Sequence, residues 1–418
     1  MKVLWVTNIL PGFLAKQLGV KTLPNLGWLD YSAEKLMKIS DVELTVLFPA
    51  DQYEDGKAEI CYYTFPRKYI LRRTDSELVP ILREKMRQIN PDIVHIYGTE
   101  YYHTVACVKA CCELGIINKT VISIQGLVSV YAEHYLNGLP ENVRHRFTLH
   151  DFLKRENLVG AMNQYRRRGE AETEALKICP NVIGRTQWDK ACTYQINKER
   201  NYYFCNETLR EVFYTGNWSY EQCNKHSIFL SQFSYPIKGF HTFLKALPEI
   251  IKNYPDTTVR ITGISPFDLP QYRINSYYKY VKDMISKNNL RQHIKFLGTL
   301  DAEQMKNEYL RCNVFVLPSS VENSPNSLGE AMLLGAPCVA SDVGGVTDLI
   351  EHKTEGFIYP QDEPYMLAHY VCTVFDSPNN ATKMGICAKA HAALTHNVEN
   401  NAQRLVNIYY GITAQKTL

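Results

Sequence analysis

The sequence lacks a long apolar run, a Cys-x-x-Cys pair and a large surplus of either charge. No stretch approaches the ~20 apolar residues of a membrane-spanning helix, so we do not expect an integral membrane protein. The formal net charge of +3 is too small to predict nucleic acid binding. The twelve cysteines are scattered apart from the adjacent Cys111 and Cys112, and without a Cys-x-x-Cys pair they do not indicate a zinc cluster. The apolar start at residues 1–6 is too short for a signal peptide, so we expect reduced thiols in a cytoplasmic protein.

Short apolar runs rich in branched residues recur along the chain between longer, helix-like stretches. Such runs are typical of buried parallel strands. A chain of 418 residues exceeds what one core usually holds, and the runs form two series of about equal length. We therefore predict an α/β protein with two Rossmann-like, doubly wound domains in tandem. The predicted strands are Val3–Val6, Leu44–Phe48, Ile93–Ile96, Val121–Ile124, Val182–Gly184, Ile228–Leu230, Thr258–Thr262, Ile294–Leu297, Val314–Leu317 and Cys338–Ala340.

The join between the two predicted domains is placed near Phe213–Asn224, where the alternation is interrupted. The first domain then spans residues 1–215 and the second spans 216–399. A C-terminal helix of about residues 400–418 is a candidate to pack back onto the first domain. Ligands of open α/β sheets bind beyond the carboxyl ends of the strands, so two facing sheets predict a cleft between the domains.

The most informative segment runs from Val314 to Met332. An apolar strand is followed by a polar loop that contains Glu322, and then by a helix that begins near Asn326 or Ser327, both good N-caps. The free N–H groups at such a helix start favour an anion such as a diphosphate. Carboxylates accept hydrogen bonds from sugar hydroxyls, so Glu322 and Glu330 could hold two different sugars.

The order of these residues resembles glycosyltransferase family 4, whose members have the GT-B fold of two facing Rossmann-like domains. The similarity includes the Glu322-x7-Glu330 spacing, the segments 335–341 and 344–350, and the turn Ser234–Gly239. It is strong over about residues 226–360 and looser in the N-terminal half. A single Glu can merely complement a helix dipole, and a Lys-Gly turn is common, so the ordered set carries the resemblance.

The resemblance implies a role for each residue of a donor site. Glu322 would contact the donor sugar near the reacting centre, and Lys238 would bind the diphosphate and stabilise charge on the departing nucleotide. Glu330 would hold the ribose hydroxyls. The backbone N–H groups of Asn326 and Ser327 would complete the phosphate site. The residues where the family packs the base are Gly298 and Thr299.

Three features depart from the family pattern. Members usually carry Gly-Arg where this chain has Ser231 and Gln232, so the donor phosphates would meet an uncharged amide. Gln125 stands where a histidine often follows the fourth strand, which puts a general base at that position in doubt. In retaining members the leaving phosphate itself is thought to accept the proton. The N-terminal Gly-Gly loop of the family aligns best with Gly27, with Gly12 as the second candidate for a close approach to the diphosphate.

Recognition of the acceptor is expected of the N-terminal domain. His95 lies within an apolar run and is expected to be a satisfied core residue, whereas His103 follows a strand end and is the better cleft candidate. Arg185 could meet a phosphate or form an ion pair with Asp189. The full set of acceptor-side candidates is His95, Tyr97, Glu100, His103, Gln125 and Arg185.

Two basic and aromatic stretches, residues 67–73 and 144–155, have a composition that suits contact with anionic lipid. A surface of this kind would serve a polyprenyl-diphosphate-linked acceptor at the inner face of a membrane. The run Arg166–Arg168 is followed by three glutamates, so a solvated, salt-bridged helix explains it equally well.

Together these features predict a retaining, metal-independent glycosyltransferase of the hexosyltransferase type. It would move a sugar from a nucleoside diphosphate sugar to a glycan or polyprenyl-diphosphate-linked acceptor in surface polysaccharide assembly, such as a capsule or O-antigen. No cofactor or metal is implied, since Lys238 and a helix start would meet the phosphate charge. A nucleotide-sugar epimerase stays open as an alternative, because Glu100 and Glu133 are available as further acids. A non-catalytic nucleotide- or glycan-binding partner subunit also stays open, encouraged only by Gln232 and Gln125.

Overall fold

A computed structural model describes residues 1–20, 28–39, 41–52 and 54–414. The chain divides into two compact units, which we call unit 1 and unit 2. Unit 1 consists of Met1–Val130, Tyr165–Arg210 and His396–Leu418. Unit 2 consists of Tyr131–Gln164 and Glu211–Thr395. Among the described residues, no helix is long and apolar enough to cross a membrane.

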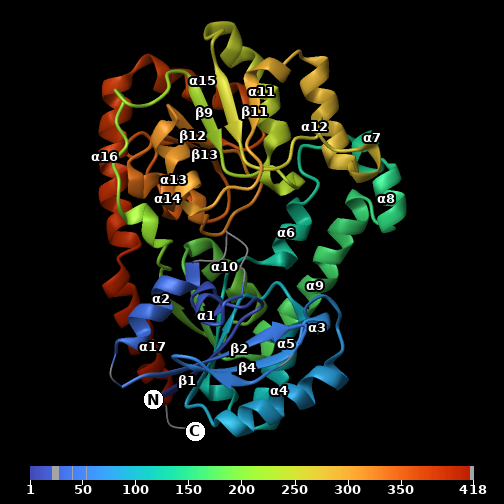
Figure 1. The fold of residues 1–418 in the computed structure, drawn as a ribbon, viewed down its shortest axis with the longest axis vertical. Helices are drawn as coiled ribbons and strands as arrows, with labels where there is room; N and C mark the ends of the chain where they lie inside the picture. The colour runs from blue at the N-terminus through green and yellow to red at the C-terminus, as the bar shows by residue number, and fades with distance from the viewer. Residues whose placement is uncertain (21–27, 40, 53, 415–418) are drawn as a thin grey trace. The chain divides into compact units, whose positions relative to one another are not determined.

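Unit 1 is built on an eight-stranded sheet with the order β3-β4-β2-β1-β5-β6-β7-β8, in which every described pair except β3–β4 is parallel (Figure 1). Its strands are β1 Lys2–Val6, β2 Glu43–Ala50, β3 Gly56–Lys57, β4 Cys61–Pro66, β5 Ile93–Tyr97, β6 Thr120–Ser123, β7 Asn181–Gly184 and β8 Asn201–Phe204. Its helices are α1 Gly12–Gln17, α2 Trp28–Met37, α3 Lys68–Leu71, α4 Asp75–Ile89, α5 Tyr102–Glu113, α10 Gln187–Ile196 and α17 Val398–Ala414, with the 3-10 turn η1 Ile117–Lys119.

The C-terminal helix α17 is part of the core of unit 1. Trp5 on the central strand β1 is fully buried and donates a hydrogen bond from Nε1 to the hydroxyl of Tyr409 at 3.0 Å. Val406 and Ile412 lie in the same apolar cluster as Trp5. Burial of this helix face against the sheet explains why the last segment belongs to unit 1.

Unit 2 contains a six-stranded, entirely parallel sheet with the order β11-β10-β9-β12-β13-β14. Its strands are β9 Ser227–Leu230, β10 Thr258–Ile261, β11 Ile294–Phe296, β12 Val314–Leu317, β13 Cys338–Asp342 and β14 Phe357–Pro360. Its helices are α7 Glu141–Arg144, α8 Leu149–Lys154, α11 Phe240–Asn253, α12 Ser276–Lys287, α13 Ala302–Arg311, α14 Asn326–Leu334, α15 Pro364–Asp376 and α16 Pro378–Thr395, with the 3-10 turns η2 Glu211–Tyr214, η3 Pro236–Lys238, η4 Gln271–Arg273, η5 Arg291–His293 and η6 Val346–Asp348.

The strand order of unit 2 changes direction at β9. From β9 the chain proceeds through β10 and β11 to one edge, and then returns to place β12 on the other side of β9. The loops that leave β9 and β12 therefore diverge, and a crevice forms at the carboxyl ends of these two strands. This switch point is the position at which an open α/β sheet is expected to bind a ligand.

The predicted fold of two Rossmann-like sheets is confirmed. All ten predicted strands are present, and the structure adds β3, β4, β8 and β14. The units differ from the predicted bounds of 1–215 and 216–399 mainly because residues 131–164 belong to unit 2. His241 of α11 donates from Nε2 to the Asn137 carbonyl at 2.9 Å, which ties this excursion to the C-terminal sheet. Helices α6 Val128–His134 and α9 Leu158–Ile178 contain two of the four points where the chain passes between units, and the other two follow Arg210 and Thr395.

Candidate functional site

The loop that follows β12 is held in place by backbone contacts from the neighbouring strands. The N–H of Ser320 donates to the Ile237 carbonyl at 2.7 Å, which joins the loop to the turn after β9. The hydroxyl of Ser341, at the end of β13, donates to the Ser319 carbonyl at 2.6 Å. The loop is buried, so these bonds fix its path between β9 and β13.

Two glycines allow the adjacent turns to close on this loop. Gly344 has a φ of 54°, and a Cβ placed on it would lie 1.8 Å from the carbonyl oxygen of Glu322. The N–H of Gly345 donates to that same oxygen at 3.1 Å. Gly239 has a φ of 68°, and its Cβ would lie 1.7 Å from the Pro318 carbonyl oxygen. Only glycine fits either position, because both require a left-handed backbone and a close approach.

Lys238 and Glu322 meet at the switch point between β9 and β12. The Nζ of Lys238 lies 2.7 Å from Oε1 of Glu322, and the Ser319 hydroxyl donates to the same oxygen at 2.7 Å. The side chains are 21% and 8% exposed, respectively. Burial works against the charge of Lys238, but attraction by Glu322 outweighs it and raises the pKa of the ammonium. The ammonium has three N–H donors and the ion pair uses one, so it can still bind an anion.

Helix α14 begins directly after this loop, at Asn326. Its N-cap is Pro325, and the first backbone bonds come from Leu328 and Gly329 to the Pro325 carbonyl at 3.0 and 3.3 Å. The expected helix start near Asn326 or Ser327 is therefore confirmed, but neither residue is the N-cap, because both lie inside the helix. Their N–H groups precede the bonded turn, where a helix start offers donors to an anion.

Glu330 is a buried carboxylate within α14. The hydroxyl of Tyr309, from α13, donates to its Oε2 at 3.3 Å. The ring of Tyr309 is itself fixed by edge contacts with Phe229 and Phe315 of the sheet. The Glu330 carboxylate is therefore held in position by a residue of the unit 2 core and does not move freely at the surface.

The other predicted donor-site residues follow neighbouring strands at the same edge of the sheet. Gln232 lies after β9 and is partly exposed. Gly298 lies after β11, where it exchanges backbone hydrogen bonds of 2.8 and 3.1 Å with Gly263 after β10. Thr299 is exposed beside it. The predicted residue Gly27 lies outside the described residues.

On the acceptor side, the expectation for His103 is wrong. Its side chain is fully buried, stacks on Phe65 at 6.2 Å between ring centroids, and has no hydrogen-bond partner among the described residues. Burial lowers its pKa to about 3, so it stays neutral in the core. The expectation for His95 is confirmed, because its two ring nitrogens lie 2.6 Å from the hydroxyls of Tyr409 and Ser123.

Arg185 is buried and paired, but its partner is Glu207 and not Asp189. Its Nη1 donates to Glu207 at 2.7 Å, and Nη2 donates to the carbonyls of Ile124 and Gln125 at 3.2 and 3.0 Å. Asp189 instead accepts the backbone N–H of Arg185 at 2.9 Å. The guanidinium is thus not placed to meet a phosphate, contrary to one of the two predicted roles.

Glu207 is a residue that the sequence interpretation missed. Its carboxylate accepts hydrogen bonds from both Arg185 and the side-chain amide of Gln125. Burial raises the pKa of Glu207, and Arg185 and Gln125 counteract this by favouring the charged form. The cavity beside Glu207 measures about 30 Å³, which is room for about one water molecule and not for a sugar. The network therefore fixes the orientation of Gln125.

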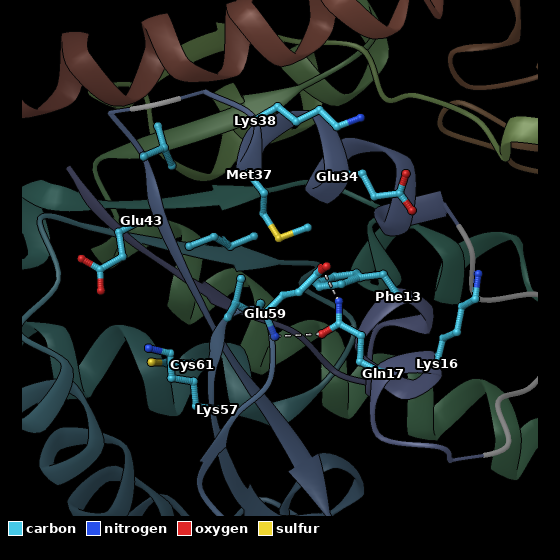
Figure 2. Close-up of a pocket in the computed structure, with 13 residues that line it drawn as sticks. Phe13, Lys16, Gln17, Glu34, Met37, Lys38, Glu43, Lys57, Glu59 and Cys61 are labelled. Atoms are coloured by element: carbon cyan, nitrogen blue, oxygen red, sulfur yellow. Dashed lines mark hydrogen bonds between the residues drawn. The ribbon is translucent and has the colours of Figure 1, made fainter.

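A larger pocket of about 980 Å³ opens in unit 1, and Figure 2 shows the residues that line it. Gln17 and Glu59 join its walls through a hydrogen bond of 2.5 Å between their side chains (Figure 2). The pocket lies near the amino ends of β2 and β4, where Glu43 and Cys61 line it. Parallel sheets bind ligands at the opposite edge, and no predicted site residue is among those that line this pocket.

Comparison with known proteins finds a family model that matches most of the C-terminal part of unit 2. Residues 222–391 match the family model "Glycosyl transferases group 1". Over these residues the chain is similar to the group 1 glycosyl transferases. The candidate site at β9, β12 and α14 lies within the matched segment, which agrees with the resemblance seen in the sequence.

Curated relatives match part of the chain. A GDP-mannose-dependent monoacylated alpha-(1-6)-phosphatidylinositol monomannoside mannosyltransferase of Corynebacterium glutamicum is 24% identical over 208 residues, which are 48% of this chain and 49% of that protein. A D-inositol 3-phosphate glycosyltransferase of Corynebacterium urealyticum is 25% identical over 41% of this chain and 40% of that protein. The chain thus spans about half or less of these relatives' length.

Solved structures match the whole fold. A sucrose-phosphate synthase from Thermosynechococcus elongatus has a TM-score of 0.71 at 14% identity, with coverage of 99% of this chain and 100% of that chain. HepE of Anabaena in complex with UDP-glucose has a TM-score of 0.68 at 17% identity, with coverage of 98% and 100%. These similarities show the GT-B fold.

Proposed function

We propose that the chain is a retaining glycosyltransferase that moves a sugar from a nucleoside diphosphate sugar to a glycan or lipid-linked glycan. The observation that carries the proposal is the Lys238–Glu322 pair, which lies at the switch point of a group 1 glycosyl transferase domain beside the open N–H groups of α14. A neighbour of the same fold holds UDP-glucose, and a curated relative is described as dependent on GDP-mannose, which supports this class of donor. We further propose a role in surface polysaccharide assembly.

The chemistry follows from the charges at this site. On donor binding, the Lys238 ammonium meets the diphosphate and stabilises the negative charge that grows on the leaving nucleotide. The bond between the anomeric carbon and the diphosphate oxygen breaks, and the acceptor oxygen bonds to the same face of that carbon. The acceptor proton passes to the leaving phosphate oxygen. Lys238 and the N–H groups of Asn326 and Ser327 supply the positive potential, so we propose that no metal is needed.

Each glutamate has a distinct proposed role. Glu330, buried beside Tyr309, accepts hydrogen bonds from the ribose hydroxyls. Glu322 contacts the donor sugar with Oε2, because Lys238 and Ser319 both bind Oε1. The Glu330 contact contributes to nucleotide affinity, whereas the Glu322 contact acts on the donor sugar as the nucleotide departs.

Donor binding and transfer can be tested separately. Thermal-shift screening against nucleotides and nucleotide sugars identifies the donor, and transfer is then followed by release of the nucleoside diphosphate. We expect Glu322→Ala to abolish transfer while nucleotide affinity stays nearly intact, and Glu330→Ala to weaken nucleotide affinity. A collapse of nucleotide affinity in Glu322→Ala with residual transfer would show that the two roles are assigned wrongly.

The stereochemical proposal has its own test. The configuration of the product at the anomeric carbon, observed by proton NMR at early times, should match that of the donor. An inverted product contradicts the retaining mechanism. Release of an epimerised nucleotide sugar without an acceptor would instead identify an epimerase.

On the acceptor side, we propose that Gln125 accepts a hydrogen bond from the acceptor. Its Nε2 donates to the Glu207 carboxylate, so the amide oxygen points away from Glu207 and can accept from a hydroxyl. Glu207→Gln removes the charge that fixes this orientation. We expect a higher KM for the acceptor at an unchanged donor KM. An unchanged acceptor KM would remove Gln125 and Glu207 from acceptor recognition.

A further inference from the structure

Helix α8 of unit 2 and the residues before it expose an unusual number of large apolar side chains. Four of them lie within seven consecutive residues, and each is more than half exposed. They are Phe147 at 55%, Leu149 at 52%, Phe152 at 69% and Leu153 at 61%. Exposed apolar residues that occur singly need no explanation, but a contiguous group points to an interaction surface. We call these four side chains the α8 apolar face.

The opposite side of α8 is fixed to unit 2 by polar contacts. Asp151 is buried and forms a capping box with Thr148, with bonds of 2.9 and 3.2 Å between backbone N–H groups and side-chain oxygens. The hydroxyl of Ser276, at the start of α12, also donates to Asp151. In Figure 1, α8 lies beside α7. This anchoring holds the polar side of the helix inward, so the apolar side faces outward in a fixed orientation.

Cations without acidic partners flank the α8 apolar face. Arg144 and Arg146 are paired with Glu141 and Asp283. Lys154 and Arg155 follow Phe152 and Leu153, are exposed, and form no ion pair within the part of the chain that the structure describes. Apolar side chains beside such cations match the interface of an anionic bilayer, where acyl chains lie beneath phosphate groups.

The other basic stretch of the sequence, residues 67–73, does not offer such a surface. Arg67 and Arg73 are paired with nearby carboxylates. Tyr69 and Ile70 are buried in unit 1, so the apolar exposure of this stretch is limited to the single side chain of Leu71, which is 71% exposed. The two basic stretches have similar composition, but in the described part of the chain the group of exposed apolar side chains with unpaired cations is found at α8 and not at residues 67–73.

We propose that the α8 apolar face inserts into the interface of an anionic lipid bilayer, with Lys154 and Arg155 at the level of the headgroups. A second copy of the chain fits this surface less well. A two-fold contact through so short a helix falls below the ~1,000 Å² of a stable interface, and would bring its cations together. This proposal rests on the proposed function, because a transferase with a lipid-linked acceptor must reach a bilayer. Vesicle binding can nevertheless be measured without transfer.

Vesicle flotation with the full chain tests the proposal. We expect the protein to float with phosphatidylcholine–phosphatidylglycerol vesicles and to bind pure phosphatidylcholine much more weakly. The double variant Phe152→Ser/Leu153→Ser should reduce partitioning by ~10-fold or more, since each side chain adds buried apolar area. The matched control is Ile386→Ser/Leu394→Ser on α16, whose side chains are 65% and 75% exposed and which should bind as the wild type does.

The charge contribution is tested by Lys154→Gln/Arg155→Asn. Asparagine suits the left-handed backbone of Arg155, whose φ is 55°. We expect ~30-fold weaker binding to anionic vesicles, because each of the two cations contributes about 1 kcal/mol near the surface and about 1.4 kcal/mol corresponds to a tenfold change. Equal binding of this variant and the wild type would overturn the role of the anionic headgroups.

Two other outcomes overturn the proposal as a whole. One is a wild-type protein that does not float with either vesicle. The other is a dimer in sedimentation velocity that Phe152→Ser/Leu153→Ser dissociates, since the face would then bind a second copy. Nucleotide binding by thermal shift should be unchanged in all variants. A chain that floats but binds no nucleotide would contradict the proposed function and leave the lipid surface intact.

Discussion

Replacing Lys238 by methionine should have two separable consequences, one for stability and one for catalysis. The variant keeps most of the apolar stem but leaves the Glu322 carboxylate, 8% exposed, with only the Ser319 hydroxyl as a side-chain partner among the described residues. Breaking a buried pair costs about 3–5 kcal/mol and an exposed pair about 0–1 kcal/mol. Lys238 is partly exposed, so its pair with Glu322 lies between these two cases. We therefore expect the free energy of unfolding to fall by about 2–3 kcal/mol.

The same substitution should remove the charge that stabilises the leaving nucleotide. Removing one such electrostatic contact typically costs about 10²–10³ in kcat. The lost stability lowers the apparent Tm by about 2–4 °C per kcal/mol in a domain of ~150–250 residues. Assayed well below its Tm, a Lys238→Met protein should thus be folded but at least ~100-fold slower.

The double variant Lys238→Met/Glu322→Gln separates the two effects. It removes the unpaired carboxylate, so the Tm should recover most of the loss. Transfer should not recover, because the charge opposite the diphosphate and the carboxylate proposed to contact the donor sugar are both missing. A Lys238→Met variant with the kcat of the wild type, or a double variant whose Tm does not recover, would refute the reasoning.

Two further predictions follow from the geometry of glycine and histidine. Gly344→Ala should lower kcat at least ~10-fold, because its Cβ must displace the Glu322 backbone. Gly298→Ala has a φ of 69° but no atom within 4 Å of its Cβ, so it should lower the free energy of unfolding by only the ~1–2 kcal/mol of left-handed strain. Equal effects of the two variants in transfer assays would contradict this. The pKa of His103 is about 3 in the folded protein and 6.5 for a free histidine, so the unfolded chain binds the proton more readily. The stability that neutral His103 provides is therefore complete above about pH 6.5 and falls on acidification, by about 2 kcal/mol at about pH 5. His103→Phe should remove that part of the acid sensitivity in urea denaturation, and an unchanged pH dependence would show that His103 already binds a proton in the folded state.

Most of the strands that the sequence predicted are short apolar runs buried on both faces of a parallel sheet, although the edge strand β11 and its neighbour β10 are partly exposed. The missed strands lack this property. Strand β8 is an edge strand whose residues are at most partly buried, and β4 is rich in tyrosine with four partly exposed positions. A strand exposed on one side has a weaker apolar pattern, which a single sequence does not separate from a loop.

The error at His103 had a detectable signal. The residue follows a strand end, where polar side chains often line a site, but α5 is apolar around most of its circumference, and its first turn is buried with the rest. A helix without a polar face is a core helix, and this outweighs its position after a strand. Arg185 is different, because its partner Glu207 follows the missed strand β8, so no local pattern connected the two.

The contrast explains why the sequence predicted that the candidate donor-site residues lie together, whereas it did not predict the contacts of His103 and Arg185. In the candidate donor site, the parallel sheet itself places Lys238, Glu322 and the start of α14 together, because each follows a central strand at its carboxyl end. The close packing of those turns requires glycine at positions 239 and 344, because no other residue fits there, so the sequence itself indicates it. On the acceptor side, the deciding contacts are between side chains from separate segments. Such contacts depend on side-chain orientation and burial, which alternation of apolar and polar residues does not encode.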